Sequence, residues 1–574
     1  MLAGILIVVI VLFLVAYRTY GGWMSRVFGL DDRNLVPAEG QYDGVDHVPT
    51  KTQVLLGHHF SSIAGAGPIV GPILAGLFFG WLPALLWIIA GSILVGGVHD
   101  FGATIASVRH KARSVAELAR QYITPRAYKL FLAFIFLALI YVIVVFMDLT
   151  AATFVDVEMN GSGVAVSAML FVGLALAMGY LTFRYGMGIR NGTLIFLPLL
   201  LLAIWVGDQV TVQNLLPAIG GSGKNTWNLV LLGYCVIAAI TPVWILLQPR
   251  DYLSSWLLYL SVIGAGVGLL IGGLSGAVEV SRSWPALVLP GDVTALGIAH
   301  LGPLFPILFI TVACGACSGF HSIVASGTTS KQVSCETDTR RIGYGAMLIE
   351  GVVAVIALSA VMVLPFGAEA FGETPIAIYA GGIGTFLSMF GIPHKFGAHF
   401  GLLALSTFLL TTLDTCTRLG RYVVQEAFAW DKNDAKSRLV STIATLVLPA
   451  ILVFMTYADP VTGQTLPAWR AVWPVFGATN QLLAALALLA ITVWLKRTGR
   501  AWAFAGIPMA FMLVMTMSAL VLLILQDGPL IIRAISSALF VLGLMLSVEA
   551  ARAFRLAELG PEPVTLKPAG AGGD

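Results

Sequence analysis

Apolar stretches close to the length of a membrane-spanning helix alternate with short polar segments along the whole chain. A helix needs about 20 predominantly apolar residues to cross the hydrocarbon core of a bilayer. About fifteen such stretches occur, at residues 2–17, 54–80, 82–103, 128–149, 164–181, 194–206, 229–247, 253–271, 303–326, 342–365, 396–413, 439–457, 472–495, 504–526 and 530–547. The pattern predicts an all-α, polytopic membrane protein.

The composition agrees with this pattern and narrows the class of protein. Of the 574 residues 58% are hydrophobic and 11% are charged, whereas a soluble domain carries about 25% charged residues. We therefore do not expect a soluble enzyme. The net charge is +3 and no Lys/Arg tract with interleaved aromatics occurs, so we expect the lipid bilayer as a partner and no nucleic acid.

Basic residues in the loops predict the orientation in the membrane, since cytoplasmic loops collect Lys and Arg. The segment 109–129 holds several Arg and Lys residues against a single acid, Glu117, and is expected to be cytoplasmic. Alternation from there places the amino end outside and the carboxyl end inside, provided that residues 376–391 do not cross fully. We expect a bacterial inner (cytoplasmic) membrane protein.

The stretch 54–80 has the composition of a helix that breaks inside the membrane. It contains His58, His59, Ser61 and Ser62, followed by closely spaced glycines and prolines, among them Gly65 and Gly67. Proline and glycine interrupt a helix and free backbone groups, which can bind a carboxylate or a cation. A close-packed helix crossing through small residues is the alternative for the glycines. The two histidines favour function because intramembrane ionisable groups are costly.

A second interruption is predicted at residues 238–253, which include Thr241 and Pro242 and lie six helices along from the first. Five helices followed by five in inverted orientation is an arrangement of transporters whose site lies at the repeat interface. The predicted division is an amino-terminal helix and linker at 1–53, a ten-helix core at 54–415, four helices at 416–558 and a disordered tail at 559–574. Arg250 and Asp251 are expected to form a solvated gate or anchor at the inner end of the second interrupted helix.

Further polar groups inside apolar stretches are candidates for binding or coupling. The run CGACSGFHSIVASGTTSKQ contains His321, Ser322, Ser326, Thr328, Thr329 and Lys331. The hydroxyls could bind a cation and Lys331 could replace one, or the hydroxyls bond to their own helix and Lys331 reaches the interface. Asp100, which follows His99, could relay a proton or cap a boundary helix. Asp414 could couple ions or pair with Arg418.

The cysteines do not indicate a disulfide framework or a metal site. Five cysteines are present and Cys314 and Cys317 form a lone CGAC pair, so small packing residues explain them better than zinc or redox chemistry. The rival function is a membrane-embedded enzyme with a metal held by His58, His59, His99 and Asp100. Against it, HExxH, GxSxG around a serine and GxxxxGK[ST] are all missing from the sequence. A sensor or receptor is a second alternative.

Several long motifs occur in a fixed order: VLLGHHFSSIAGAGPIVGP, PVWILLQPRDYL, CGACSGFHSIVASGTTSKQ, IGYGAML, TTLDTCTRLGRYVVQE and WPVFGATNQLLAALAL. Together they resemble the carbon starvation protein family, CstA. The resemblance implies a LeuT-type core and uptake of peptides or small carboxylates such as pyruvate, with protons, during carbon starvation. It departs from the expected pattern at His99, where a glutamine would be more usual before the aspartate.

From these observations we expect an all-α, LeuT-type 5+5 inverted-repeat core with extra helices at both ends. The expected function is secondary active transport, not enzymatic catalysis, with no cofactor, no metal and a proton or sodium as the coupling ion. Predicted substrate-binding residues are Ser61, Ser62, Gly65, Gly67, Thr241, His321 and Ser322. Predicted coupling residues are His58, His59, Asp100, Ser326, Thr328, Thr329, Lys331 and Asp414.

Overall fold

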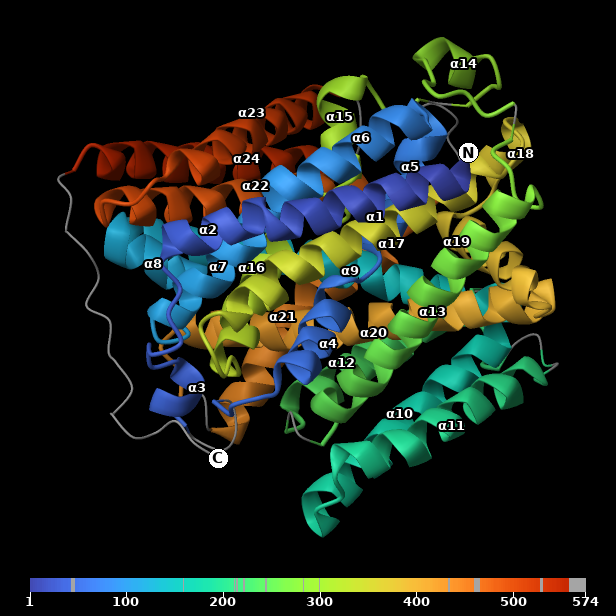
Figure 1. Ribbon diagram of the computed structural model, residues 1–574, viewed down its shortest axis with the longest axis horizontal. Helices are drawn as coiled ribbons and strands as arrows, with labels where there is room; N and C mark the ends of the chain where they lie inside the picture. The colour runs from blue at the N-terminus through green and yellow to red at the C-terminus, as the bar shows by residue number, and fades with distance from the viewer. Residues whose placement is uncertain are drawn as a thin grey trace.

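The structure is a computed structural model that describes residues 1–556 apart from 43–46, 158, 211, 213–214, 220–221, 243–244, 282, 299, 432–433, 459–464 and 527–529. Long helices lie side by side and form a bundle (Figure 1). The tail that was expected to be disordered, residues 559–574, lies outside the described residues.

The first half of the chain contains α1 (Leu2–Arg18), α2 (Tyr20–Phe28), α3 (Pro37–Gly40), α4 (Thr52–Ile63), α5 (Gly67–Phe79), α6 (Trp81–Gly91), the π-helical turn η1 (Ser92–Gly96), α7 (Gly97–Arg109), α8 (Val115–Tyr122), α9 (Pro125–Val155), α10 (Gly161–Tyr185), α11 (Ile189–Asp208), α12 (Gly223–Ile240) and α13 (Leu247–Ser275).

The second half contains α14 (Pro290–Thr294), α15 (Leu304–Thr311), α16 (Gly319–Gly327), the 3₁₀ turn η2 (Thr329–Lys331), the π-helical turn η3 (Arg340–Gly345), α17 (Ala346–Met362), α18 (Ala368–Gly372), α19 (Pro375–Leu387), η4 (Ser388–Phe390), α20 (His394–Ala427), α21 (Ala435–Phe454), α22 (Ala468–Arg497), α23 (Ala503–Leu525) and α24 (Leu530–Phe554). Strands β1 (Tyr457–Ala458) and β2 (Thr465–Leu466) form a small antiparallel pair.

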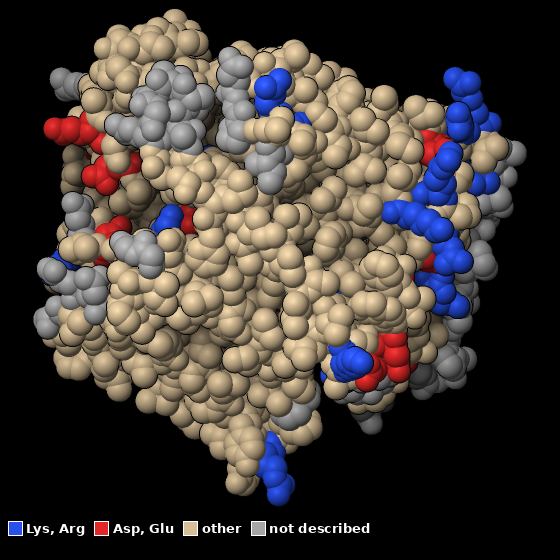
Figure 2. All heavy atoms as spheres, turned by 180° about the vertical axis from the view of Figure 1, so that it is seen from behind, with Lys and Arg blue, Asp and Glu red and all other residues tan. Residues whose placement is uncertain are grey.

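Among the described residues, 12 helices are long and apolar enough to cross a membrane, or 13 if the bent pair α4 and α5 counts as one span. Neither α12 nor the pair α15 and α16 is among them. The expected number of about fifteen spans is therefore not confirmed. Figure 2 shows a broad surface free of charged side chains beside an edge where Lys and Arg gather, as a membrane protein requires.

Two helices are broken. The first consists of α4 and α5, which are bent by 46° at residues 64–66. The second consists of α15 and α16, separated by residues 312–318. Because α4 packs against α16 and α5 packs against α15, the two broken helices lie side by side in opposite directions.

The second break was predicted at residues 238–253, and this position is wrong. There the chain leaves α12 at Ile240 and enters a separate helix, α13, at Leu247. The sequence pattern led to the wrong helix because Pro242 marks the end of α12, whereas the actual break contains small residues and no proline.

The helices that follow the two breaks make reciprocal contacts. The segments α6–α7 and η3–α17 pack together, α9 packs against α20, and α12 packs against α21. In the same way α13 packs against α4, and α22 packs against α16. These pairs form the expected inverted repeat of five plus five helices. Along the chain, the hairpin of α10 and α11 lies between α9 and α12, and α19 lies between α17 and α20.

Helix α19 is too short to cross the membrane. Together with η4 it forms one apolar helix, Pro375–Phe390, which spans about 24 Å at 1.5 Å per residue, whereas the hydrocarbon core is about 30 Å thick. This length matches the expectation that residues 376–391 do not cross fully. After the repeat, α23 and α24 pack on the outer side of α22.

Candidate functional site

Four ionisable side chains meet in the interior where α7, α16 and α17 touch. The Oδ1 atom of Asp100 lies 2.7 Å from Nδ1 of His99, and its Oδ2 atom lies 2.7 Å from Nδ1 of His321. On its other side, Nε2 of His321 lies 3.3 Å from Oε2 of Glu350. All four side chains are fully buried. In this group, which we call the Asp100 cluster, one imidazole joins two carboxylates.

Glu350 is the least satisfied member of the cluster. Within the described part of the chain, neither of its carboxylate oxygens has a hydrogen-bond partner. A buried carboxylate without hydrogen bonds carries a desolvation cost that the contact with His321 offsets only in part, and protonation removes this cost. The surroundings of Glu350 therefore suit a carboxyl group that binds and releases a proton.

Each carboxylate of the cluster follows a π-helical turn. Asp100 lies in the first turn of α7, directly after η1, and Glu350 lies in α17 a few residues after η3. Such turns are rare and occur frequently at functional sites. Asp100 is inside a continuous span and not at its end, so the alternative that it caps a boundary helix does not apply.

Glycines let the two π-helical turns approach each other. A Cβ atom on Gly97 would lie 2.2 Å from the ring of Tyr344, and one on Gly343 would lie 2.8 Å from Cα of Phe101. No side chain fits at either position without moving the backbone. The motif IGYGAML thus has a packing role that places Glu350 opposite Asp100.

The hydroxyls in and just after α16, Ser322 predicted to bind substrate and Ser326 and Thr328 predicted to couple ions, bond to that helix. Ser322 donates to the carbonyl of Gly319 at 2.7 Å, Ser326 to that of Ser322 at 2.7 Å, and Thr328 to that of Val324 at 3.0 Å. This is the alternative that competed with cation binding. Lys331 lies half-buried after the helix.

Thr329 is the exception among these hydroxyls. Its Oγ1 atom lies 2.8 Å from Nδ1 of His59, and both side chains are fully buried. His59 lies within electrostatic range of Asp100 and His321. The first broken helix therefore contacts the turn η2, which follows the second broken helix, through a histidine within electrostatic range of the Asp100 cluster.

A second buried group joins α4, α12, α13 and α20. Arg250 forms an ion pair with Asp414 and donates a hydrogen bond to the hydroxyl of Tyr234 at 2.8 Å. Arg250 also lies 3.2 Å from Asp251, whose other oxygen lies 3.2 Å from Nδ1 of His58. This Arg250 cluster connects the first broken helix to helices of both repeats.

Two expectations about this region are corrected. Arg250 and Asp251 were expected to be solvated at the inner end of a helix, but both are fully buried. Asp414 does not pair with Arg418, which instead donates to the carbonyls of Ala238 and Thr241 at 2.7 Å. Thr241 itself ends α12, so the structure does not place this predicted substrate ligand at either break.

The first break is tightly enclosed. A Cβ atom on Gly65 would lie 2.8 Å from the ring of Phe146, and one on Gly67 would lie 2.3 Å from the side chain of Cys314 in the second break. Ser61 and Ser62 donate to the carbonyl of His58. The two glycines therefore allow the unwound segments to touch, while the two hydroxyls satisfy their own helix.

Two amide side chains of α22 form hydrogen bonds with the backbone at the second break, and the sequence analysis predicted neither of them. The Oδ1 atom of Asn480 accepts from the backbone N–H of Phe320 at 3.0 Å, and its amide donates to Ser318 at 3.1 Å. Gln481 donates to the carbonyls that α15 leaves free, including that of Ala313 at 3.1 Å. Their only signal in the sequence is two adjacent amides within an apolar stretch.

Glu350 was also missed, although its signal was stronger. It is a lone carboxylate inside the apolar stretch 342–365, and intramembrane carboxylates are functional candidates by default.

The histidines named for a metal site do not converge. His58 faces Asp251, His59 faces Thr329 and His99 faces Asp100. Among the described residues, no group of three or more His, Cys, Asp or Glu side chains is arranged to hold a metal ion.

Comparison with known proteins identifies the family. The family model described as carbon starvation protein CstA matches residues 2–372 and 367–519. The chain belongs to the CstA family. Its relatives include the peptide transporter CstA of Escherichia coli (strain K12), 33% identical over 90% of this chain and 80% of that one. They also include the pyruvate/proton symporter BtsT of the same strain, which is 31% identical over 90% of this chain and 81% of its own.

The family settles the general class of protein: it is a multi-pass membrane protein and a secondary transporter of small molecules, not an enzyme. Among solved structures, MhsT in complex with L-phenylalanine covers 88% of this chain and 99% of its own, with a TM-score of 0.45 and 13% identity.

Proposed function

We propose that this protein imports peptides or a small carboxylate such as pyruvate together with protons. The observation that carries the proposal is the Asp100 cluster, in which His321 joins the buried carboxylates of Asp100 and Glu350. The two carboxylates come from the corresponding helices of the two repeats, α7 and α17. Protonation of Glu350 would therefore act between elements that move relative to each other in alternating access.

The substrate is proposed to bind at the two breaks, residues 64–66 and 312–318. Unwound backbone and the starts of half-helices suit an anionic group, because free amides and the helix dipole favour negative charge. Gly65 and Gly67 would contribute backbone at the first break. Ser61, Ser62 and Ser322 are predicted to change their hydrogen bonds when substrate enters.

His321 fits proton coupling better than substrate binding. It was predicted to face the substrate, but both of its ring nitrogens lie beside carboxylates. His59 is the second proposed coupling residue, since it lies within electrostatic range of this group. Asp414 and His58 are proposed to act through the Arg250 cluster, which links α4 to both repeats. A proton is favoured over sodium because the hydroxyls of Ser326 and Thr328 bond to their own helix.

The proposed orientation in the bacterial inner membrane has the amino end outside and the carboxyl end in the cytoplasm. The cations of the segment 109–129 and of the loop that contains Arg340 and Arg341 would then lie inside, as the positive-inside rule requires.

Uptake into proteoliposomes tests the proposal. Labelled pyruvate and labelled di- and tripeptides are offered under an imposed proton gradient, an imposed sodium gradient, or neither. We expect saturable accumulation of one of these classes under the proton gradient alone. Accumulation driven by sodium would contradict proton coupling. Failure of folded protein to accumulate either class would contradict the proposed substrates.

A further inference from the structure

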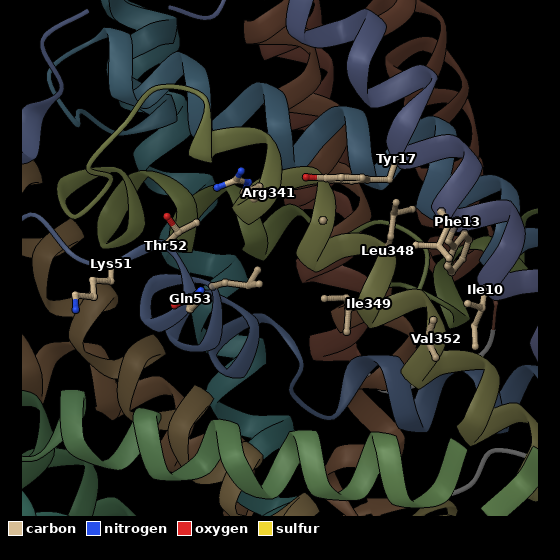
Figure 3. Close-up of a pocket in the computed structure, with 13 residues that line it drawn as sticks. Ile10, Phe13, Tyr17, Lys51, Thr52, Gln53, Arg341, Leu348, Ile349 and Val352 are labelled. Atoms are coloured by element: carbon tan, nitrogen blue, oxygen red, sulfur yellow. The ribbon is translucent and has the colours of Figure 1, made fainter. Parts of the chain in front are cut away.

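A long groove opens between α1, α4 and α17 on the surface of the membrane domain (Figure 3). Its volume is about 850 Å³. The groove is lined along most of its length by apolar side chains, including Ile10, Phe13, Leu348, Ile349 and Val352. Arg341 and Val352 are eleven residues apart, so the groove follows α17 for about 17 Å.

One end of the groove is polar and basic. Lys51 and Thr52 from the start of α4, Arg341 from η3 and the hydroxyl of Tyr17 lie there (Figure 3). The side chain of Arg341 is 65% exposed, and one of its nitrogens lies 3.2 Å from Asp338. Lys51 is exposed.

Further cations surround this end. A neighbouring hollow of about 700 Å³ shares Tyr17 and Arg341 with the groove and is also lined by Arg26 and Arg340. The guanidinium of Arg340 lies 4.5 Å from the centre of the Tyr17 ring. Among the described residues that line the groove and this hollow, the cations Arg26, Lys51, Arg340 and Arg341 outnumber Asp338, the carboxylate that pairs with Arg341.

The rest of the groove faces the hydrocarbon of the membrane. On α1 the residues beside it, including Val11, Leu14 and Val15, have exposed apolar side chains. The basic end lies where the chain enters α4 and α17, at the same level as the loop that contains Arg340. An occupant must therefore be apolar over most of its length and negatively charged at one end, at the depth of the lipid headgroups.

A phospholipid with an anionic headgroup has this chemistry. Its acyl chain matches the apolar trough, and Lys and Arg near the membrane surface attract anionic headgroups. We propose that the groove binds one anionic phospholipid, with its phosphate between Lys51 and Arg341 and an acyl chain along α1 and α17.

Such a lipid would contact the part of the transporter that is expected to move. Gln53 and Leu56 of α4 line the groove, and His58 lies half a turn further along the same half-helix, where it contacts Asp251. A bound lipid would pack against one face of α4, while His58 on another face contacts Asp251 of the Arg250 cluster. Occupancy of the groove is therefore expected to stabilise α4 in the position described.

Native mass spectrometry of the detergent-purified protein tests the proposal without any transport assay, so its outcome is independent of the proposed substrate. Phosphatidylglycerol is titrated into delipidated protein, and the bound fraction is measured. Parent protein is expected to bind one lipid specifically. Because each Lys or Arg contributes about fivefold in affinity, K51A/R341A is expected to bind about 30-fold more weakly.

Two further variants make the test specific. The substitutions K129A/K436A remove two exposed cations on other helices and should leave the affinity unchanged. Ile349→Trp keeps every charge but fills the apolar part of the groove, and should reduce binding. Inorganic phosphate at millimolar concentration should not displace the lipid.

Three results would overturn the proposal. The first is equal lipid binding by the parent and K51A/R341A. The second is displacement by inorganic phosphate, with Ile349→Trp unaffected, which would indicate a simple anion site. The third is a lipid-free dimer that K51A/R341A and Ile349→Trp both convert to monomer, which would show that a second copy of the chain covers the groove.

Discussion

Every proton that the Asp100 cluster binds or releases changes its net charge. Two buried carboxylates, Asp100 and Glu350, flank His321. If both are ionised and His321 is the one protonated histidine of the cluster, with His99 neutral, a net negative charge remains in a region of low dielectric constant. Each change of protonation therefore changes the attraction between α7, α16 and α17. A proton is held best when these helices are close, and is released most readily when water reaches Glu350.

Glu350→Gln should separate binding from proton coupling. The amide keeps the size of the side chain but cannot release a proton. We expect accumulation driven by a proton gradient to fall at least about tenfold, as expected when a proton carrier is removed, while exchange of labelled for unlabelled substrate persists. Uptake and counterflow in the same proteoliposomes measure both quantities. Glu117→Gln, on the surface helix α8, is the control and should change neither. Full proton-driven accumulation by Glu350→Gln would remove this residue from the mechanism.

Asn480→Ala should destabilise the second break. It leaves the buried N–H of Phe320 without an acceptor and Ser318 without its partner. A buried polar group that loses its partner costs about 1–3 kcal/mol, so the melting temperature in detergent should fall. Asn480→Asp retains an acceptor for the N–H of Phe320 but buries a carboxylate, so it should destabilise the protein as well. An unchanged melting temperature for Asn480→Ala would mean that water or relaxation replaces these bonds.

Single residues of the site differ in how readily the sequence reveals them. Glu350 is a charge within an apolar stretch, which composition alone can mark as functional. The pairing of Arg250 with Asp414 was not predictable, because the residues are 164 positions apart. Local spacing favoured the pair Asp414 and Arg418, but Arg418 lies close enough to the end of α12 to bind its free carbonyls.

At the level of helices, close contact between the two broken helices depends on glycine. A Cβ atom on Gly71 of α5 would lie 2.6 Å from the carbonyl oxygen of Thr311 in α15. That neighbour is backbone and cannot rotate away. The contact is one of several in which a half-helix of one repeat touches the other repeat without an intervening side chain.

Gly71→Ala is expected to abolish transport and to lower the melting temperature, because the two half-helices must separate. Gly173→Ala is the matched control. Gly173 also lies within a helix, α10, but a Cβ atom there would meet nothing within 4 Å, so this variant should transport normally and retain its stability. Normal transport by Gly71→Ala would show that α5 and α15 can separate without loss of function.

Substitutions at Arg250 and Asp414 should have non-additive effects on stability. Arg250→Met leaves the buried carboxylates of Asp251 and Asp414 without their cation, and breaking a buried ion pair costs about 3–5 kcal/mol. Adding Asp414→Leu removes one of these unpaired charges and should recover part of the loss. Thermal unfolding of both single variants and the double variant gives the coupling. Additive losses would show that Arg250 and Asp414 do not depend on each other.

The sequence predicted that an inverted repeat exists, but not which helices belong to it. The first broken helix was located correctly from its glycines and prolines. The second was placed by counting six helices along, which assumes that no helix is inserted. The count fails because the α10–α11 hairpin adds two helices, and an inserted helix has the same hydrophobic pattern as any other. The second break itself, residues 312–318, contains no proline, so its small residues do not stand out from the apolar stretch around them.

At the level of the whole molecule, the loop charges make a prediction about sidedness. A fluorescent protein fused after Asp574 should fluoresce, because it folds in the cytoplasm, whereas an alkaline phosphatase fusion at the same position should be inactive. Fusions of both reporters at Gln209, after α11, should give the reverse result. Phosphatase activity at the carboxyl end would invert the proposed orientation.

The opposite directions of the two broken helices also bear on the energy difference between inward-facing and outward-facing states. Exchanging the conformations of the two repeats generates the opposite-facing state from the same backbone contacts, so main-chain packing contributes nearly equally to both states. The balance between them then depends on the side chains that differ between the two repeats. Natural variation at those positions would shift the equilibrium between the inward-facing and outward-facing states without altering the fold.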